Sequence, residues 1–231
     1  KHQSVSPMSI IANPQRPVVE ALVRSTLARH LGQATLPPPA PTLVVNSSAR
    51  HMHISPENLA TLFGPNAKLT VHKWLHQEGQ FAAEQTVTLI GPRRRVIPNL
   101  RILGPCRNLT QIELALTDAI QLGVDLPVRM SGDIQGTPGG YVMGPAGMLE
   151  MREGLIRAAR HIHMSPSDAK FYAVKHLDRI TLKVTSPACN TRFDDLIVRV
   201  DPSFRLEVHM DTDEANACDL ERATKVEIFP T

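Results

Sequence analysis

The stretch that decides the fold is Ala49-Arg50-His51-Met52-His53-Ile54-Ser55-Pro56, which returns as Ala159-Arg160-His161-Ile162-His163-Met164-Ser165-Pro166. Six of its eight positions are identical, and the other two exchange methionine and isoleucine, so their apolar character is kept. The two copies lie 110 residues apart, which is about the length of a small domain. We therefore interpret the chain as two halves related by an internal repeat.

Each copy predicts a strand that presents two histidines to one target. Alternate residues of a strand point to the same face, so His51 and His53 share a face, as do His161 and His163. The Ser-Pro pair that ends each copy is typical of a helix N-cap followed by the first helical residue. A single His-x-His pair is more often two ordinary polar strand residues, but its repetition in the same frame favours a metal site.

The repeat continues downstream and supplies a third candidate ligand in each half. The strand Gln111–Leu114 aligns with Glu207–Met210, which puts Glu113 opposite His209. Both are zinc-ligand types, and three protein ligands leave a coordination position open, as in catalytic zinc sites. Without the alignment, an exposed strand carboxylate is an equally good interpretation of Glu113. The candidate metal ligands are His51, His53 and Glu113 in the first half and His161, His163 and His209 in the second.

The composition of the 231-residue chain is that of an ordinary globular protein, with 42% hydrophobic and 20% charged residues. No apolar run approaches the roughly 20 residues that span a bilayer, so we expect no membrane partner. The net charge of +3 permits an anionic ligand, but dispersed basic residues and an aromatic content of 4% argue against nucleic acid. The three widely spaced cysteines favour a reducing cytosol over a disulfide framework.

Residues 1–41 form a segment of their own. Apolar residues recur at spacings of 3 and 4 between Pro17 and Leu31, which predicts an amphipathic helix that Gly32 ends, and residues 36–42 form a proline-rich linker. Such a helix on a tether is typical of a docking or targeting peptide. A mitochondrial presequence and a helix packed on its own domain stay open, whereas charged residues within the stretch argue against a secretory signal.

Short strands dominate the chain from Thr42 onward, and many short strands at close spacing indicate β-barrels. The predicted fold class is mainly β, with two small β-barrel domains related by the repeat, short helices at 56–63 and 166–171, and the N-terminal amphipathic helix. We place the first barrel at 42–140 and the second at 141–231. The predicted strands are 43–46, 68–75, 86–90, 99–103, 111–116, 124–129, 140–143, 180–185, 196–200, 205–210 and 225–229.

Three further features bear on anion binding. Arg107 follows Gly104-Pro105 and precedes the strand with Glu113, so its guanidinium is a candidate to bind an anion held at the metals. The glycine-rich loop 131–140 lets backbone N–H groups approach a phosphate, but it matches no known phosphate fingerprint, and a plain connecting loop is favoured. Arg93-Arg94-Arg95 is interpreted as a solvated hairpin tip.

Several stretches together resemble one known family. They are the two histidine phrases, Gly-Gln-Phe-Ala-Ala-Glu (79–84), Arg-Ile-Leu-Gly-Pro (101–105), Ser-Gly-Asp (131–133) with Gly-Thr-Pro-Gly (136–139), and His-Met-Asp-Thr-Asp-Glu-Ala-Asn (209–216). In these motifs the chain resembles the PduL-type phosphate propanoyltransferases, the phosphotransacylases of bacterial microcompartments. The resemblance runs from about residue 42 to the C-terminus.

The resemblance implies a function, cofactors and partners. It implies two β-barrel domains with two zinc ions at their interface and an exchange of coenzyme A for phosphate on a propanoyl or acetyl group. The family's zinc positions coincide with the six candidate ligands, and its phosphate-contacting arginine matches Arg107. Ser131, Gln77 and Gln80 resemble positions near the family's coenzyme A site. The N-terminal helix resembles an encapsulation peptide, which implies a microcompartment shell or cargo partner and location in the lumen; we also expect a homo-oligomer.

Direct transfer is the mechanism that the sequence favours, because no Ser/His/Asp or Cys/His nucleophile phrase is present. One zinc is expected to take the coenzyme A sulfur, while the other zinc and Arg107 position the phosphate. The alternative is a dinuclear zinc hydrolase acting on a thioester or phosphoester, which would need no phosphate-binding arginine. A non-catalytic, metal-stabilised structural protein is the third interpretation.

Overall fold

The computed structural model describes residues 16–30 and 39–230 and divides the chain into two units, Lys1–Pro41 and Thr42–Thr231. In the first unit, helix α1 spans Arg16–His30. Four of its apolar side chains are exposed, namely Val19, Leu22, Val23 and Leu27. A helix is therefore present in this segment. Its amphipathic character and its use as a docking or targeting peptide stay predictions. Leu31, Gly32 and the first part of the predicted linker lie outside the described residues.

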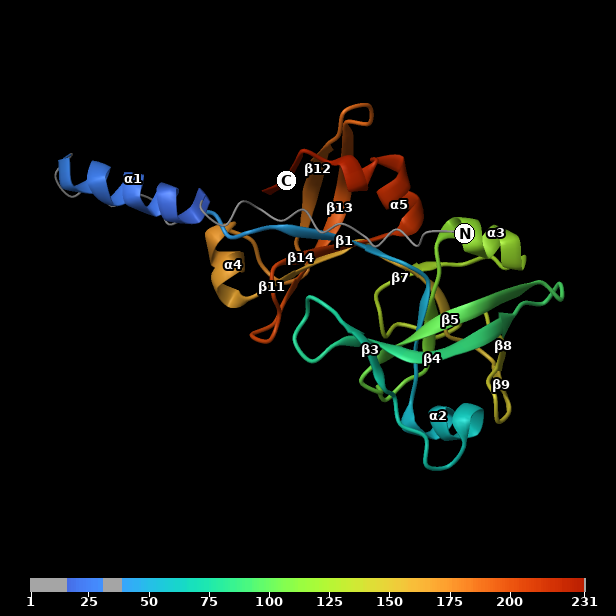
Figure 1. Cartoon of the computed structure of the whole chain (residues 1–231). Helices are drawn as coiled ribbons and strands as arrows, with labels where there is room; N and C mark the ends of the chain where they lie inside the picture. Colours follow the sequence, from blue (N-terminus) through green and yellow to red (C-terminus); the bar gives the residue numbers. More distant parts are fainter. Residues whose placement is uncertain (1–15, 31–38, 231) are drawn as a thin grey trace, which may run out of the picture. The chain divides into compact units, whose positions relative to one another are not determined.

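The second unit is mainly β, as predicted, and contains two curled half-barrel sheets (Figure 1). The smaller sheet has six strands in the order β1 (Val44–Ser48), β14 (Glu207–Asp211), β11 (His161–Met164), β13 (Thr191–Val200), β12 (Arg179–Thr185) and β15 (Lys225–Pro230). The larger sheet follows the order β7 (Val128–Arg129), β10 (Leu155–Ala158), β6 (Gln111–Glu113), β2 (His51–His53), β5 (Val96–Gly104), β4 (Phe81–Ile90), β8 (Gly140–Met143) and β9 (Met148–Met151), and β3 (Val71–Trp74) pairs with β4.

The helices of the second unit are short. They are α2 (Pro56–Phe63), α3 (Leu116–Leu122), α4 (Pro166–Phe171), α5 (Thr212–Ala217) and the 3-10 helix η1 (Leu220–Arg222). Ser55 Oγ accepts a hydrogen bond from Asn58 N at 3.2 Å, and Ser165 Oγ accepts one from Asp168 N at 3.2 Å. These N-caps confirm the helices predicted after both histidine phrases. Within the described ranges, no helix has the length and apolar character needed to cross a membrane.

The two sheets exchange strands along the chain. Strand β1 precedes both histidine phrases but pairs in parallel with β14 of the smaller sheet, and Figure 1 shows it running beside the orange strands. Conversely, β8, β9 and β10 follow residue 139 but belong to the larger sheet. Strand pairing therefore crosses the proposed domain boundary at residue 140 in both directions, and the division into two domains stays a prediction. Strands β9 and β10 were not among the predicted strands.

The two histidine strands are paired in the same way. Strand β2 lies between β5, which is parallel to it, and β6, which is antiparallel. Strand β11 lies between parallel β13 and antiparallel β14. The register places His51 opposite Glu113 and His161 opposite His209. This likeness is what the repeat predicts for these strands, whereas the relation between the two whole halves stays a prediction.

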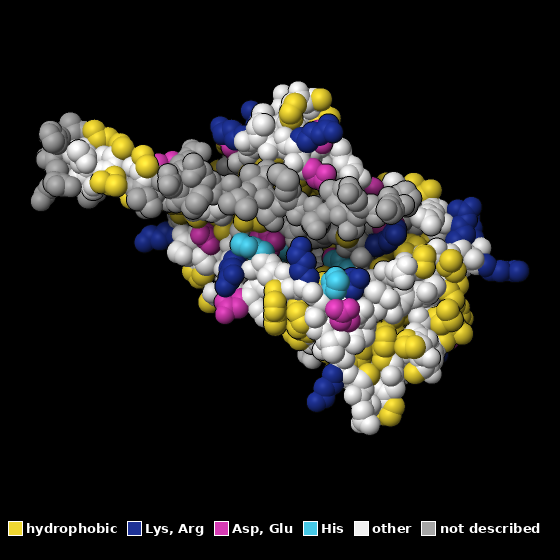
Figure 2. Space-filling model, viewed as in Figure 1, with side chains coloured by type: hydrophobic (Ala, Val, Ile, Leu, Met, Phe, Trp, Pro, Cys, Tyr) yellow, Lys and Arg dark blue, Asp and Glu magenta, His cyan; other side chains and the backbone are white. Residues whose placement is uncertain are grey.

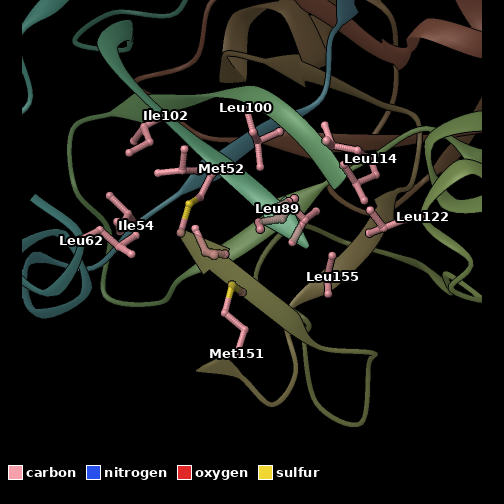
Figure 3. Packing of buried hydrophobic residues seen from close by; sticks show 14 of the residues in the cluster. Met52, Ile54, Leu62, Leu89, Leu100, Ile102, Leu114, Leu122, Met151 and Leu155 are labelled. Atoms are coloured by element: carbon pink, nitrogen blue, oxygen red, sulfur yellow. The ribbon is translucent and has the colours of Figure 1, made fainter. Parts of the chain in front are cut away.

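Alternation along the histidine strands turns the imidazoles away from the hydrophobic cores. Met52 has no exposed surface and lies among Ile102, Leu100 and Leu89 in the core of the larger sheet (Figure 3). Ile162 takes the corresponding place in the core of the smaller sheet. Methionine and isoleucine have similar volumes, so their exchange between the two phrases fits both cores. The histidines on either side of each apolar residue therefore share the opposite face.

The arginines at 93–95 lie at the exposed end of the hairpin between β4 and β5. Arg94 N donates to Gly91 O at 3.1 Å, and Gly91 N donates to Arg95 O at 2.9 Å, which closes the turn. This confirms the predicted hairpin tip.

Candidate active site

The first group of candidate ligands consists of His51 and His53 on β2 and Glu113 on β6. We call it the first triad. Each residue offers a ligand atom, and these atoms all lie within 4.8 Å of one another. The Nε2 atoms of the two histidines are 3.2 Å apart, and Glu113 Oε2 lies 3.5 Å from His51 Nε2. All three residues are buried, so their metal-ligand atoms converge where little water reaches them.

The second group consists of His161 and His163 on β11 and His209 on β14, and we call it the second triad. Its ligand atoms also lie within 4.8 Å of one another. The rings of His161 and His209 are stacked with centroids 5.0 Å apart, and Phe204 stacks on His163 at 4.0 Å. The structure thus brings together both sets of residues that the sequence predicted.

Backbone carbonyls orient the first histidine of each triad. His51 Nδ1 lies 2.8 Å from Ala49 O, and His161 Nδ1 lies 2.9 Å from Ala159 O. A carbonyl only accepts, so each Nδ1 is the donor of its hydrogen bond, and Nε2 is the ring nitrogen left to bind a metal. Such an outer partner is how metal-binding histidines are held in place.

The donor sets fit a metal. Among the described protein atoms, four buried imidazole nitrogens lack a hydrogen-bond partner: His53 Nδ1, His163 Nδ1, His163 Nε2 and His209 Nε2. Burial is the main cause that lowers the pKa of His53 to about 2, that of His163 to about 2 and that of His161 to about 4. These rings are neutral at physiological pH. His53 and His163 thus combine a neutral ring with a buried nitrogen that lacks a partner among the described residues, which is the state that zinc binding requires.

Glu113 belongs to a hydrogen-bonded network that reaches Arg107. Burial by itself raises the pKa of Glu113, but the neighbouring His51 and His53 outweigh it and lower the pKa to about 2. Gln111 Nε2 donates to Glu113 Oε1 at 2.6 Å and to Ser131 Oγ at 2.6 Å. Arg107 Nη1 also donates to Ser131 Oγ at 3.3 Å. The structure therefore places both Arg107 and Ser131 beside the first triad.

Gln77 reaches the second triad through a buried carboxylate. Its Nε2 donates to Glu207 Oε2 at 2.6 Å, and the same Glu207 oxygen lies 3.2 Å from His209 Nε2. Gln80 closes the same loop through its backbone, since its N–H donates to Gln77 O at 3.2 Å. Gln77, which was predicted to lie near the active site, is therefore close to the candidate metal ligand His209. A role of the Gln80 side chain stays a prediction.

Residues of both triads line one cavity. His51 and Glu113 of the first triad and His161 and His209 of the second line it together, and its volume is about 20 Å³, room for about one water molecule. Figure 2 shows histidine side chains beside Lys and Arg side chains on one face of the second unit. A ligand in this cavity would meet both triads at once.

Comparison with known proteins gives the family. Residues 44–221 match the family model described as phosphate propanoyltransferase. A phosphate propanoyltransferase of Planctopirus limnophila is 52% identical over 95% of this chain and 94% of its own length. Those of Thermotoga maritima and Escherichia fergusonii are 51% and 48% identical over 77% and 74% of this chain, and over 84% and 80% of their own lengths. The chain belongs to the phosphate propanoyltransferase family. It is an enzyme of the phosphotransacylase class.

Sequence reasoning missed three residues that lie near the triads, namely Gln111, Glu207 and Arg199. Gln111 and Glu207 each lie two residues before a third ligand, so the strand alignment already contained their signal. They stand opposite His53 and His163 in the strand registers. Arg199 stands opposite His163 on β13, and its charge contributes to lowering the pKa of that histidine. No local pattern distinguishes Arg199 from an ordinary strand arginine.

Proposed function

We propose that this protein exchanges coenzyme A for phosphate on a propanoyl or acetyl group, by direct transfer at a site that holds one zinc ion in each triad. The observation that carries the proposal is the single cavity lined by both triads. Reacting groups that bind to the two triads beside one cavity are held close together, which makes their reaction effectively unimolecular. Zinc bound there would supply Lewis acidity toward a thioester sulfur and a phosphate oxygen.

Arg107 is the proposed phosphate-binding residue. It stays cationic although partial burial lowers its pKa, and Glu113 opposes that change. Arg107 Nη1 donates to Ser131 Oγ, and among the described residues no partner is found for the other guanidinium donors, which can bind two phosphate oxygens. We further propose that Ser131, Gln77 and Gln80 contact coenzyme A. In the exchange, a phosphate oxygen bonds to the acyl carbon, the carbon–sulfur bond breaks, and coenzyme A leaves as thiolate.

Direct transfer is favoured because the groups near the site are poor nucleophiles. Ser48 Oγ lies 3.5 Å from His209 Nδ1, but His209 belongs to the second triad, and a ring that binds a metal there is not available as a base for the serine. Burial raises the pKa of the Cys106 thiol, next to Arg107, so little thiolate is present at neutral pH. Neither group competes well with phosphate for the acyl carbon.

The proposal is tested by measuring thiol release from propanoyl-CoA and acetyl-CoA with and without phosphate, together with the zinc content of the protein. We expect about two zinc equivalents and release that requires phosphate, with acyl phosphate as the second product. Release without phosphate would support the dinuclear zinc hydrolase. An active protein that contains no metal would remove zinc from the proposal.

We propose that the N-terminal unit directs the enzyme to a microcompartment lumen through a shell or cargo protein, and that the enzyme is a homo-oligomer. The exposed Val19, Leu22 and Leu27 of α1 support such an association.

Deleting residues 1–41 should leave turnover within about twofold, because every candidate site residue lies beyond residue 42. Localisation of a fluorescent protein fused to residues 1–41, compared with the same fusion carrying Leu22→Glu and Leu27→Glu, measures the targeting. Equal distribution of the two fusions would count against it.

A further inference from the structure

The chain crosses from the larger sheet to the smaller sheet over two residues. Strand β10 ends at Ala158 in the larger sheet, and β11 begins at His161 in the smaller one. Each of the two sheets carries one triad. Ile156 pairs with Glu113, and Leu114 N donates to Ile156 O at 3.0 Å, so β10 is bound to the ligand strand of the first triad.

Two arginines flank the crossover and bind the same carboxylate. Arg157 Nη2 and Arg160 Nε donate to Glu214 Oε1 at 3.3 and 2.9 Å. Arg157 Nε also donates to Asp211 Oδ2 at 2.8 Å. Both carboxylates are 7% exposed, so these ion pairs are well shielded from water. We call Arg157, Arg160, Asp211 and Glu214 the crossover cluster.

The crossover cluster is tied to the second triad through the backbone. Asp211 lies two residues after His209, and its N–H donates to Glu214 Oε2 at 3.0 Å. Asp211 Oδ1 in turn accepts from Glu214 N at 2.8 Å. Arg157 therefore extends from the strand beside Glu113 to the segment that follows His209, and Asp211 itself lines the cavity between the triads.

The first triad has a matching tie. Arg50 Nη1 donates to Asp118 Oδ1 at 2.7 Å, and Asp118 Oδ2 accepts from Ala115 N at 3.2 Å. Asp118 lies five residues after Glu113, just as Glu214 lies five residues after His209. In the larger sheet the tie joins Arg50, just before β2, to the first turn of α3, just after β6. In the crossover cluster a second arginine, Arg157 on β10, connects the tie to the larger sheet. Two other contacts join segments that belong to the two sheets: Gln77 Nε2 donates to Glu207 Oε2 at 2.6 Å, and Thr117 Oγ1 donates to Asp213 Oδ1 at 2.6 Å.

We propose that Arg157 is a positioning residue that, together with the Gln77 and Thr117 contacts, holds the two triads at a fixed separation. This inference rests on the proposed function, because separation matters only if substrates are bound at both triads. Loss of Arg157 leaves each triad and its own tie intact. Metal binding and substrate binding are then retained, whereas the alignment of one substrate with the other is lost.

The test compares Arg157→Gln with the wild type and with two controls. We expect Arg157→Gln to keep the zinc content of the wild type and its KM values within about threefold, while kcat falls about 20-fold. Arg157→Lys keeps the charge but binds one carboxylate at a time, so it should recover part of kcat. It also provides the test if Arg157→Gln folds poorly. Arg50→Gln should instead weaken zinc retention against a chelator about tenfold, since it loosens one triad. Arg192→Gln, which removes an exposed pair with Asp194 in the smaller sheet, should change neither quantity.

Three results would overturn the inference: an unchanged kcat in Arg157→Gln, a rise in KM without a change in kcat, or a loss of zinc equal to that in Arg50→Gln. The last result would make Arg157 a support of the second triad alone. The proposed function is judged separately by the wild type, since a wild-type protein with fewer than two zinc equivalents contradicts it whatever Arg157 does.

Discussion

His51→Ala is expected to abolish metal binding at the first triad and to lower turnover about 10³-fold. The substitution removes one of three converging donors, and Glu113 and His53 alone form a weak site. Loss of a Lewis acid removes several kcal/mol of charge stabilisation in the transition state, which corresponds to about three orders of magnitude in rate. Zinc content should fall by one equivalent, as measured by elemental analysis beside steady-state kinetics.

His72→Ala is the matched control for this substitution. His72 is exposed, lies on β3 and pairs with Glu84, with Nδ1 3.1 Å from the carboxylate, so it belongs to neither triad. We expect its zinc content and turnover to equal those of the wild type. If His51→Ala retains two zinc equivalents, or if both variants lose activity equally, the first triad is not a metal site.

Arg107→Ala is expected to lower kcat/KM for phosphate about 100-fold while the zinc content stays at the wild-type level. The reason is the loss of two charge-assisted hydrogen bonds to phosphate, worth together about 3 kcal/mol. KM for acyl-CoA should change much less, because that substrate is proposed to meet Ser131 and Gln77 instead. Initial rates measured over a range of phosphate concentrations give the ratio directly.

Arg94→Ala serves as the control for Arg107→Ala, since it removes an arginine from the exposed hairpin tip between β4 and β5. Its kinetics should match the wild type. A phosphate dependence that is the same in Arg107→Ala and in the wild type would exclude Arg107 from the phosphate site, and it would return the dinuclear hydrolase to consideration.

Local patterns in the sequence were sufficient to predict the pieces of the candidate site. Alternation placed His51 and His53 on one face and Met52 on the other, and the Ser-Pro pairs predicted where the next helices begin. The alignment of two strands found Glu113 and His209. These features depend on neighbours within a few residues, whose geometry is set by the backbone period and by local capping. Whether the triads bind zinc stays a prediction.

The tertiary structure decided which strands belong to which of the two sheets. Strand β1 pairs with β14, and this choice of partner depends on long-range contacts that the local sequence of β1 does not contain. Strands β9 and β10 were missed for the same reason, since their short stretches acquire strand structure only through their neighbours.

The sequence by itself determined which side chains can bind a metal and on which face of each strand they lie. Only the tertiary structure decided that the two triads line one cavity and that Arg157, an ordinary arginine in its local sequence, reaches Asp211 across the crossover. The physical reason is that the chemistry of a side chain and the period of a strand are local properties. The distance between two strands and the partner of a charge depend instead on how the whole chain packs.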